Sequence, residues 1–596
     1  MLFSHILKQT LKVFAGFAFF VAATCLFRCC STEVLTFRDD WGSVVLFGFI
    51  FGALWQLISF SRKNIVFCFI FYFLYLFASF TKIFCNMILS EREIIHTLCV
   101  VTLFYAFLMI LKAFSAKISA PKANMVIKIF ADVMCFLFLL PCFVRIGYFC
   151  VNRAIFDADI LLTLFQTNLS ETAAYLADQN KAVWLGGIFL ILILLGGLTS
   201  LFHKIKNTQK ISVGAILLCL VLTGLGVKQL EKLNVNFLSN IVCNTYETLK
   251  NFKDYNENKN KRMAQIQKLS AYLKSDETNG IYILVIGESE SRDHMSAYGY
   301  KQKTTPGLDK MAKNTNSILF SNAYSNHTHT IPTLSFSLSS ANQYNHIELK
   351  DSYSIIELAK AAGFETYWYS NQPKDSVFIT PVLIMASTAD HELWLNSAIG
   401  DKLSVQYYDE QLLKVFDAHQ MNKKSLVIVH LMGSHGAYRD RYPKDFQKFK
   451  QKNKNVAAYD NSILYTDYVL SRLYEKVSAL PDFKAMFYFS DHGDDVDSRL
   501  GHESTRFTYP MARIPFVAFF SDSFIKDYPV FFETLKQNKD QVFTNDLIFD
   551  LMVSALNIKG FEQASDVYDL SSSKYGLTRE NALTLHGKRN LKEDIK

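Results

Sequence analysis

The chain has 596 residues, of which 50% are hydrophobic and 14% aromatic, and its formal net charge is +8. This composition is too apolar for an ordinary water-soluble protein, and nearly all of the apolar excess lies before about residue 230. The modest charge and the lack of basic clusters interleaved with aromatic residues exclude a typical nucleic-acid-binding protein. All 11 cysteines lie at or before Cys243, so no disulfide can stabilise the second half of the chain.

Seven apolar segments in the first half approach the length of about 20 residues that a helix needs to cross a bilayer. They run near Thr10–Phe27, Gly42–Phe60, Asn64–Phe84, Ile94–Phe114, Met125–Tyr148, Ala182–Phe202 and Ile211–Val227. The second and the seventh are the weakest. The alternative is that one of them lies in the membrane interface and does not span the bilayer. The sequence therefore predicts a multi-pass helical membrane domain over residues 1–230.

The charges of the connecting loops predict the orientation of this domain. Lysine and arginine gather at the N-terminus and in every second connection, whereas the other connections are richer in acidic residues. Because basic residues accumulate on the cytoplasmic side, the N-terminus is expected in the cytoplasm, and an odd number of spans places everything after Val227 outside. Apolar residues at helical spacing between residues 152 and 181 predict an amphipathic helix, in the outer interface or on the soluble domain.

The polar stretch 231–278 predicts one or two linking helices along the membrane surface. From residue 279 onward, strand-like segments alternate with helical ones. The expected strands and helices are Ile281–Ile286, Thr305–Lys313, Ile355–Ala362, Phe364–Tyr369, Val405–Phe416, Leu426–Leu431, Tyr459–Val477, Phe487–Phe489, Ile514–Phe520 and Leu547–Leu556. Such alternation indicates a mostly parallel, doubly wound sheet covered on both faces, in an α/β domain over residues 279–596. The charged tail Leu591–Lys596 is expected to be solvated.

Four strand ends or turns of this domain carry side chains that bind metals. They are Glu288, His430 with His435, Asp491 with His492, and His502 with Glu503. Each has a plain alternative as an ordinary strand end or loop histidine. Because the carboxyl ends of parallel strands meet at one edge of a sheet, however, their recurrence predicts a centre for zinc or a similar divalent ion, or two such centres side by side.

A threonine-containing segment is the best candidate for a nucleophile. Thr330 directly precedes Ile331-Pro332 and an apolar, helix-like stretch. A hydroxyl there faces the unpaired N–H groups at the start of a helix, where a phosphate binds. The alternative is that Thr330 only caps the helix. His327 and His329 flank this segment as substrate contacts, further ligands or plain loop residues.

Eight motifs, taken in chain order, resemble those of membrane-anchored phosphoethanolamine transferases, which belong to the alkaline phosphatase/sulfatase superfamily. They are Glu288 after a strand, Ser296-Ala-Tyr-Gly-Tyr300, Thr330-Ile-Pro-Thr333, Ser434-His-Gly436, Tyr459–Asp467, Ser490-Asp-His-Gly493, Gly501-His502 and Arg513-Ile-Pro515. The resemblance covers roughly residues 281–556 and, more loosely, the membrane half. Two departures concern the acceptor: the soluble half lacks the disulfides of the lipid A-directed members, and Asp494 stands where a glutamate often follows.

The resemblance implies a role for each matching residue. The ligands of the main zinc would be Glu288, Thr330, Asp491 and His492. Thr330 would be the nucleophile, preferred to Thr328 because Thr333 and Leu334 fit the family pattern. His435 and His502 would contact the phosphoryl group or a second zinc.

The implied activity is zinc-dependent transfer of phosphoethanolamine from phosphatidylethanolamine to lipopolysaccharide, lipid A or another surface glycan, through a covalent phospho-threonine. The enzyme would be a multi-pass protein of the inner membrane with a periplasmic catalytic domain. A phosphoglycerol transferase of the same superfamily is an alternative, whereas a sulfatase is set aside because the soluble half has no cysteine and no Ser-x-Pro-x-Arg motif. A rival of another class is a transporter or receptor with an inert ectodomain, although the few charges in the spans argue against an ion pathway.

Overall fold

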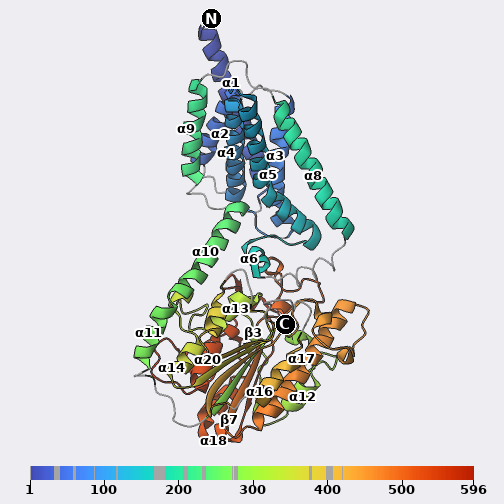
Figure 1. Ribbon diagram of the computed structural model, residues 1–596, viewed down its shortest axis with the longest axis vertical. Coiled ribbons are helices and arrows are strands. Elements are labelled where there is room, and N and C mark those ends of the chain that lie inside the picture. Colours follow the sequence, from blue (N-terminus) through green and yellow to red (C-terminus); the bar gives the residue numbers. More distant parts are fainter. Residues whose placement is uncertain are drawn as a thin grey trace. The chain divides into compact units, whose positions relative to one another are not determined.

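The structure is a computed structural model in which the chain forms two compact units (Figure 1). The first comprises Met1–Leu164 with Ala177–Glu247, and the second Phe165–Leu176 with Thr248–Lys596. The structure describes residues 2–31, 41–57, 62–85, 87–115, 118–166, 181–205, 213–230, 236–270, 273, 280–374, 379–396, 407–418 and 421–595.

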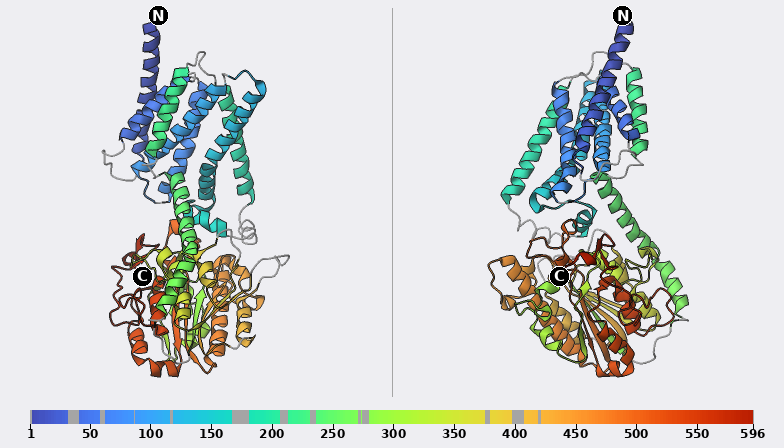
Figure 2. Two further views of the ribbon diagram at one scale, coloured as in Figure 1. Left: turned by 60° about the vertical axis from the view of Figure 1, so that its left-hand side comes forward. Right: turned by 180° about the vertical axis from the view of Figure 1, so that it is seen from behind.

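The first unit is a bundle of helices that run side by side (Figures 1 and 2). Its long helices are α1 (Leu2–Arg28), α2 (Trp41–Leu57), α3 (Arg62–Phe84), α4 (Glu91–Ser115), α5 (Pro121–Asn152), α8 (Lys181–Lys204) and α9 (Val213–Leu230). The short α6 (Ala158–Gln166) follows α5 and contains the boundary between the two units, which falls after Leu164. Five described helices, α1, α3, α4, α5 and α8, are long and apolar enough to cross a membrane. The predicted second and seventh segments also contain apolar helices, Gly42–Leu54 and Cys219–Gln229. Both are shorter than the five helices that are long enough to cross a membrane. The predicted multi-pass helical region is thus confirmed.

Aromatic packing and a few polar pairs hold this bundle together. The rings of Phe104 and Phe138 stack with their centroids 3.8 Å apart, joining α4 to α5. His203 on α8 pairs with Asp132 on α5 at 2.9 Å. The Arg145 guanidinium donates to the Ala78 carbonyl at 2.8 Å. Asp132 and Arg145, two of the charges within the spans, therefore have partners on neighbouring helices, which fits a structural role.

Two helices, α10 (Phe237–Glu257) and α11 (Lys259–Leu269), occupy the predicted linking stretch. Within the second unit, Arg262 on α11 lies over the Tyr255 ring, 3.7 Å from its centroid, and its Nε is 3.5 Å from a carboxylate oxygen of Glu357. All three side chains are buried, so α11 is packed firmly onto its own unit. The position of this stretch along the membrane surface stays a prediction.

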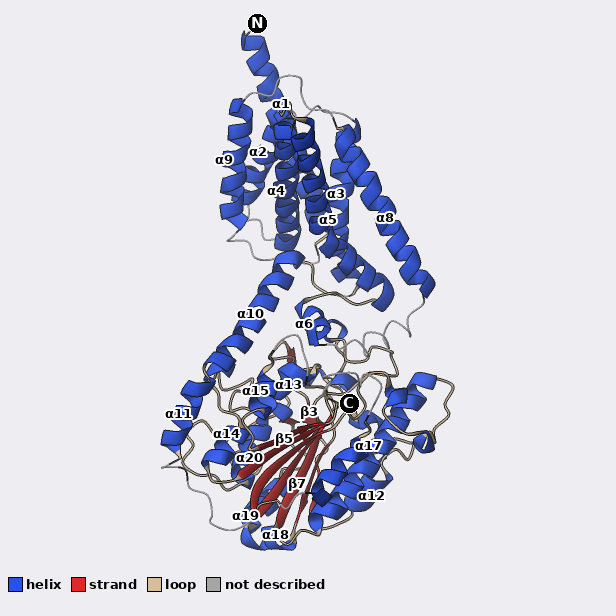
Figure 3. Cartoon of the chain, in the orientation of Figure 1, coloured by secondary structure: helices blue, strands red, loops and turns tan. Residues whose placement is uncertain are grey.

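The second unit is built on a seven-stranded sheet with the order β2-β8-β7-β1-β6-β4-β5 (Figure 3). The strands are β1 (Gly280–Gly287), β2 (Ser317–Leu319), β4 (Glu365–Ser370), β5 (His391–Trp394), β6 (Lys424–His430), β7 (Phe483–Ser490) and β8 (Phe516–Phe520). Pairing is parallel from β7 through β1, β6 and β4 to β5, and antiparallel where β8 joins β7 and β2 joins β8. The predicted mostly parallel sheet is confirmed.

Alternate residues of the central strands enter two different cores, which is why the strands read as unbroken apolar runs. Leu284 and Ile286 of β1 face one core, and Ile283 and Val285 face the other. The first core is closed by α13 (Thr330–Ser337), α14 (Ile355–Ala361), α15 (Pro381–Ala386), α18 (Asp522–Asp527), α19 (Pro529–Gln537) and α20 (Ile548–Ala555), and the second by α12 (Pro306–Met311), α16 (Val415–Ala418) and α17 (Lys454–Ser478). Helices therefore cover both faces of the sheet.

Two sequence predictions for this unit were wrong in detail. The expected helix at Val405–Phe416 is, where described, a 3-10 helix at Asp409–Lys414 followed by the short α16. The charged tail is not simply solvated, because Leu591 and Asp594 are buried. Asp594 accepts hydrogen bonds from Arg513 Nε and the Tyr324 hydroxyl, both at 2.9 Å.

Candidate active site

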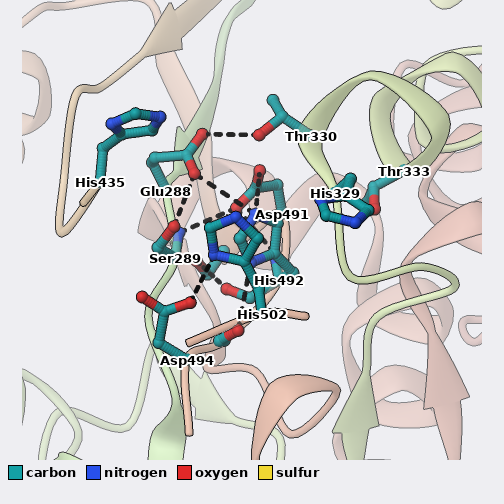
Figure 4. Close-up of polar contacts among 12 residues, drawn as sticks. Glu288, Ser289, His329, Thr330, Thr333, His435, Asp491, His492, Asp494 and His502 are labelled. Carbon is teal, nitrogen blue, oxygen red and sulfur yellow. Dashed lines mark hydrogen bonds and ion pairs between the residues drawn. The ribbon is translucent and has the colours of Figure 1, made fainter. Parts of the chain in front are cut away.

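The carboxyl ends of three adjacent parallel strands deliver the candidate site residues (Figure 4). Glu288 follows β1, and Asp491 and His492 follow β7, the neighbour of β1 in the sheet. β6 lies on the other side of β1, and the loop after it carries His435. Since parallel strands end at the same edge, segments far apart in the sequence come together here.

Glu288, Asp491 and His492 form a compact group of metal-type ligands. One ligand atom from each of them lies within 4.8 Å of the others. His492 Nε2 is 3.4 Å from Glu288 Oε1 and 3.5 Å from Asp491 Oδ2. All three side chains are buried. Two carboxylates and one imidazole converging in the interior are a donor set suited to a divalent cation.

Neighbouring groups fix the orientation of these three side chains. Asp491 Oδ1 accepts hydrogen bonds from the backbone N–H groups of Ser289 (3.0 Å) and His492 (2.6 Å). His492 Nδ1 lies 3.1 Å from the Gly493 carbonyl, to which it donates, so that Nε2 is turned towards the carboxylates. Asp491 Oδ2 is buried and has no hydrogen-bond partner among the described residues. These atoms are the ones a metal ion would use.

The ionisation of this group shows how strongly its charges interact. Burial alone would raise the pKa of Glu288, but the hydrogen bond and charge of His492 hold it well below its usual range. Burial and the nearby Glu288 raise the pKa of Asp491 to about 8. Burial lowers the pKa of His492, but Asp491 and Glu288 outweigh it and raise this pKa to about 10. A cation at this point would relieve the repulsion between the two carboxylates.

Thr330 is the first residue of α13 and faces this group. Its hydroxyl donates to Glu288 Oε2 at 3.0 Å (Figure 4). Pro332 lies in the first turn of the helix, a position where its missing N–H costs nothing. Thr328 differs: its hydroxyl is fully buried and has no hydrogen-bond partner among the described residues. Of the two threonines, Thr330 is therefore the one that contacts Glu288.

The two further predicted histidines lie on different sides of Glu288 (Figure 4). His502 Nδ1 is 2.7 Å from Asp494 Oδ1, and its ring lies 4.6 Å from that of His492. His492, Asp494 and His502 form a second group with ligand atoms within 4.8 Å. His435 belongs to the loop after β6, and its charge helps to lower the pKa of Glu288.

Other histidines and carboxylates named from the sequence lie elsewhere or have local partners. His430 ends β6, but its buried ring packs against Trp368, with centroids 5.8 Å apart. Glu503 accepts a hydrogen bond from the Thr505 N–H. His329 is buried with its ring 5.3 Å from that of His502.

Several residues of the site were missed from the sequence. Ser289 donates its hydroxyl to Glu288 Oε1 at 2.7 Å, and Gln372 Nε2 lies 3.5 Å from Glu288 Oε2. Asp494 accepts from the Tyr438 hydroxyl as well as facing His502. Asp494 could have been found, because it belongs to the same Asp-His-Gly-Asp run as the ligands. Gln372 has no comparable local signal.

Comparisons with known proteins support this architecture. Residues 281–558 match the family model described as Sulfatase. Phosphoethanolamine transferase EptC of Escherichia coli K12 is 27% identical over 440 residues, which cover 68% of this chain and 76% of EptC. The integral membrane lipooligosaccharide phosphoethanolamine transferase A (EptA) of Neisseria meningitidis superposes with a TM-score of 0.57 at 17% identity, covering 88% of this chain and 97% of EptA. The zinc complex of the periplasmic domain of E. coli EptC matches with a TM-score of 0.49 at 26% identity, over 53% and 93% of the two chains.

The greater part of the second unit, residues 281–558, thus matches the Sulfatase family model. About two thirds of the chain is similar in sequence to the phosphoethanolamine transferase EptC, which agrees with the resemblance predicted from the sequence. The fold of the chain, a helical membrane region followed by an α/β domain, is that of EptA.

Proposed function

We propose that this protein is a zinc-dependent phosphoethanolamine transferase of the inner membrane with a periplasmic catalytic domain. It takes phosphoethanolamine from phosphatidylethanolamine and passes it to lipopolysaccharide, lipid A or another surface glycan. One observation carries the proposal: the Thr330 hydroxyl, at the start of a helix, lies 3.0 Å from Glu288, within a group of buried metal-type ligands. The names of EptC and EptA supply the transferred group, and that of EptA supplies a lipooligosaccharide acceptor.

In this proposal Glu288, Asp491 and His492 hold one zinc ion, with Thr330 as the fourth donor. The unpaired Asp491 Oδ2 and the inward-facing His492 Nε2 fit such an ion. When bound, zinc lowers the pKa of a hydroxyl and neutralises charge on the transferred phosphoryl group. His435 and His502 contact phosphoryl oxygens, or His502 and Asp494 help to hold a second ion.

The chain's own residues then divide the work of two displacement steps. Thr330 Oγ forms a bond to the phosphorus of the donor lipid, the bond from phosphorus to the diacylglycerol oxygen breaks, and diacylglycerol leaves with a proton. The Thr330 proton already points to Glu288 Oε2. In the second step an acceptor hydroxyl oxygen attacks the same phosphorus, the bond to Thr330 Oγ breaks, and the proton lost by the acceptor passes to Thr330 Oγ, which restores the free hydroxyl. The N–H groups at the start of α13 stabilise negative charge on the phosphoryl oxygens.

Mass spectrometry of the intact protein after exposure to phosphatidylethanolamine tests the nucleophile. We expect a phosphoethanolamine adduct on the wild type and none on Thr330→Ala. Thr333→Ala is the matched control, because the Thr333 hydroxyl donates to the His327 carbonyl, away from Glu288. An adduct that persists in Thr330→Ala contradicts the assignment, and an adduct formed only from phosphatidylglycerol identifies a phosphoglycerol transferase instead.

Zinc content tests the metal site separately. Asp491→Asn replaces a charged ligand oxygen, so we expect the purified variant to hold zinc at least about tenfold more weakly than the wild type. The control is Asp497→Asn, because the Asp497 side chain is 76% exposed and lies outside both ligand groups. Zinc would be measured by elemental analysis after dialysis against a graded chelator. Equal zinc retention in Asp491→Asn and the control means that the ion lies elsewhere.

A further inference from the structure

An apolar cavity of about 210 Å³ lies within the membrane unit, bordered by α1 and α3. Its walls include Ala23 and Thr24 from α1 and Cys68 from α3. These three side chains are small, whereas the rest of the bundle is rich in phenylalanine. Because they do not fill the space between α1 and α3, a cavity remains there. Phe51 of α2 and Leu98 of α4 also border it, so four helices enclose one space.

The lining of the cavity is almost entirely apolar. The hydroxyls that border it already have partners: Tyr72 with Thr102 at 2.7 Å, Tyr105 with Asn64 at 2.7 Å, and Thr24 with the Phe20 carbonyl at 2.9 Å. A buried water needs two to four polar partners, and a lipid head group needs more. Only an apolar occupant suits such a lining. Apolar cavities of about 150 Å³ already admit a ligand of the size of benzene.

The bordering side chains also show from where an occupant enters. Phe19 of α1 and Phe69 and Phe73 of α3 border the cavity and are 56%, 65% and 49% exposed. Both helices are long and apolar enough to cross a membrane, so these exposed rings face hydrocarbon when the unit is embedded. The medium at the opening is therefore made of acyl chains.

We propose that this cavity binds a segment of one acyl chain of a membrane phospholipid, irrespective of its head group. An unfilled cavity forfeits the dispersion contacts of its lining, and an acyl chain from the adjacent bilayer restores them without leaving a polar group unpaired. This site lies wholly in the membrane unit and is independent of the proposed catalytic function.

Native mass spectrometry of the full-length protein tests the site. The delipidated protein in detergent would receive phosphatidylethanolamine or, separately, phosphatidylglycerol with identical acyl chains. We expect one tightly held intact lipid per chain at this site, with equal occupancy for the two head groups; a covalent phosphoethanolamine adduct on Thr330 has a different mass and is counted separately. Cys68→Phe fills the cavity from α3 and should weaken binding at least about tenfold. The matched control is Val66→Phe on the same helix, because Val66 is 42% exposed and does not border the cavity.

A second filling variant keeps the test decisive. Ala23→Leu narrows the cavity from the opposite wall and should also lower the lipid occupancy, in case Cys68→Phe does not yield a monodisperse protein. Lipid occupancy that stays at the wild-type level in the folded filling variants overturns the proposal. Binding of phosphatidylethanolamine without binding of phosphatidylglycerol also overturns it, because it would reveal a head-group site.

Discussion

At the scale of single residues, the site depends on how closely two loops approach each other. Gly433, in the loop after β6, has φ +50°, and a Cβ placed on it would lie 2.8 Å from both the N and the O atoms of Glu288. The Ser434 N–H donates to the Glu288 carbonyl at 2.9 Å, and the carboxylate of Asp409 accepts from the Met432 and Gly433 N–H groups. The backbone of the His435 loop is thus held directly against the backbone of Glu288.

Gly433→Ala should therefore damage the site. The added methyl group must push Glu288 or its own loop aside, and the left-handed backbone costs about 1–2 kcal/mol more for alanine. We expect transfer activity to fall at least about tenfold. The control is Gly436→Ala, three residues later, where a Cβ meets nothing within 4 Å. Activity of both variants on a labelled lipid donor gives the comparison, and equal activities would show that the close approach is unimportant.

The sequence predicted the site residues that directly follow strands. It did not predict Gln372 and Asp409, which contact the site from other parts of the chain. Glu288, Asp491 and His492 directly follow long apolar runs, so their place at the sheet edge could be predicted. Gln372 and Asp409 could not, because their importance arises from contacts with Leu431, Met432 and Gly433, which only the fold brings near. The pairing of His502 with Asp494 was hidden for the same reason.

At the scale of elements, a buried carboxylate supports the N-terminus of α12. Asp467 on α17 accepts hydrogen bonds from the N–H groups of Gly307 (2.7 Å) and Leu308 (2.8 Å). Burial raises the pKa of Asp467 to about 7, although these two N–H groups partly offset the effect. The contact joins two helices on the same face of the sheet, and it depends on pH.

The pH dependence of stability has a definite sign here. The pKa of Asp467 is raised in the folded state, so between about pH 4 and about pH 7 the folded protein keeps a proton that the unfolded chain has lost. The contribution of Asp467 to the free energy of unfolding should then decrease as pH rises through that window, by on the order of 2–4 kcal/mol. The side chain of Asp467→Asn cannot titrate. The free energy of unfolding of the wild type minus that of the variant should therefore decrease as pH rises.

Thermal unfolding of the full-length protein from about pH 4 to pH 8 measures this difference. Asp445→Asn is the control, because Asp445 is exposed. If the difference in stability between the wild type and Asp467→Asn does not change with pH, the Asp467 carboxylate keeps its ordinary pKa in the folded protein.

Element-level predictions succeeded where a segment was long and buried on both sides. The central strands β1, β6 and β7 are almost completely buried and were predicted within a few residues. The edge strands β2 and β5 were not, because they have only 3 and 4 residues and are partly exposed. They form strands because they pair with β8 and β4, and their own sequences give little indication of a strand.

At the scale of the whole molecule, the C-terminal segment packs over the loop that precedes α13 in the second unit. The His586 N–H donates to the Asn326 carbonyl, and the Thr584 hydroxyl to the Ser325 carbonyl at 2.7 Å. Asp594 then pairs with Arg513, which precedes β8. The tail was misjudged from its composition, because a run of charges does not reveal a buried partner 81 residues away.

Asp594→Ala should destabilise the protein strongly. It leaves the Arg513 guanidinium without one of its two carboxylate partners in a buried setting, at a cost of about 3–5 kcal/mol. Glu593→Ala is the matched control: the Glu593 side chain is 49% exposed and its ion pair with Arg589 spans 3.7 Å, so its removal should cost less than about 1 kcal/mol. Chemical unfolding of both variants supplies the comparison, and similar free energies of unfolding would contradict the structural role of the tail.

The distance along the chain between the ligands has a consequence for how the protein matures. Ser289, beside the first ligand, and Asp491 are 202 residues apart in sequence and are joined only by the finished sheet. In the metal site proposed above, a nascent chain that has not yet paired β7 with β1 lacks two of the three ligands, so the ion cannot act as a template for early folding. Loading of the cation should accordingly be a late event, limited by completion of the domain rather than by supply of the metal.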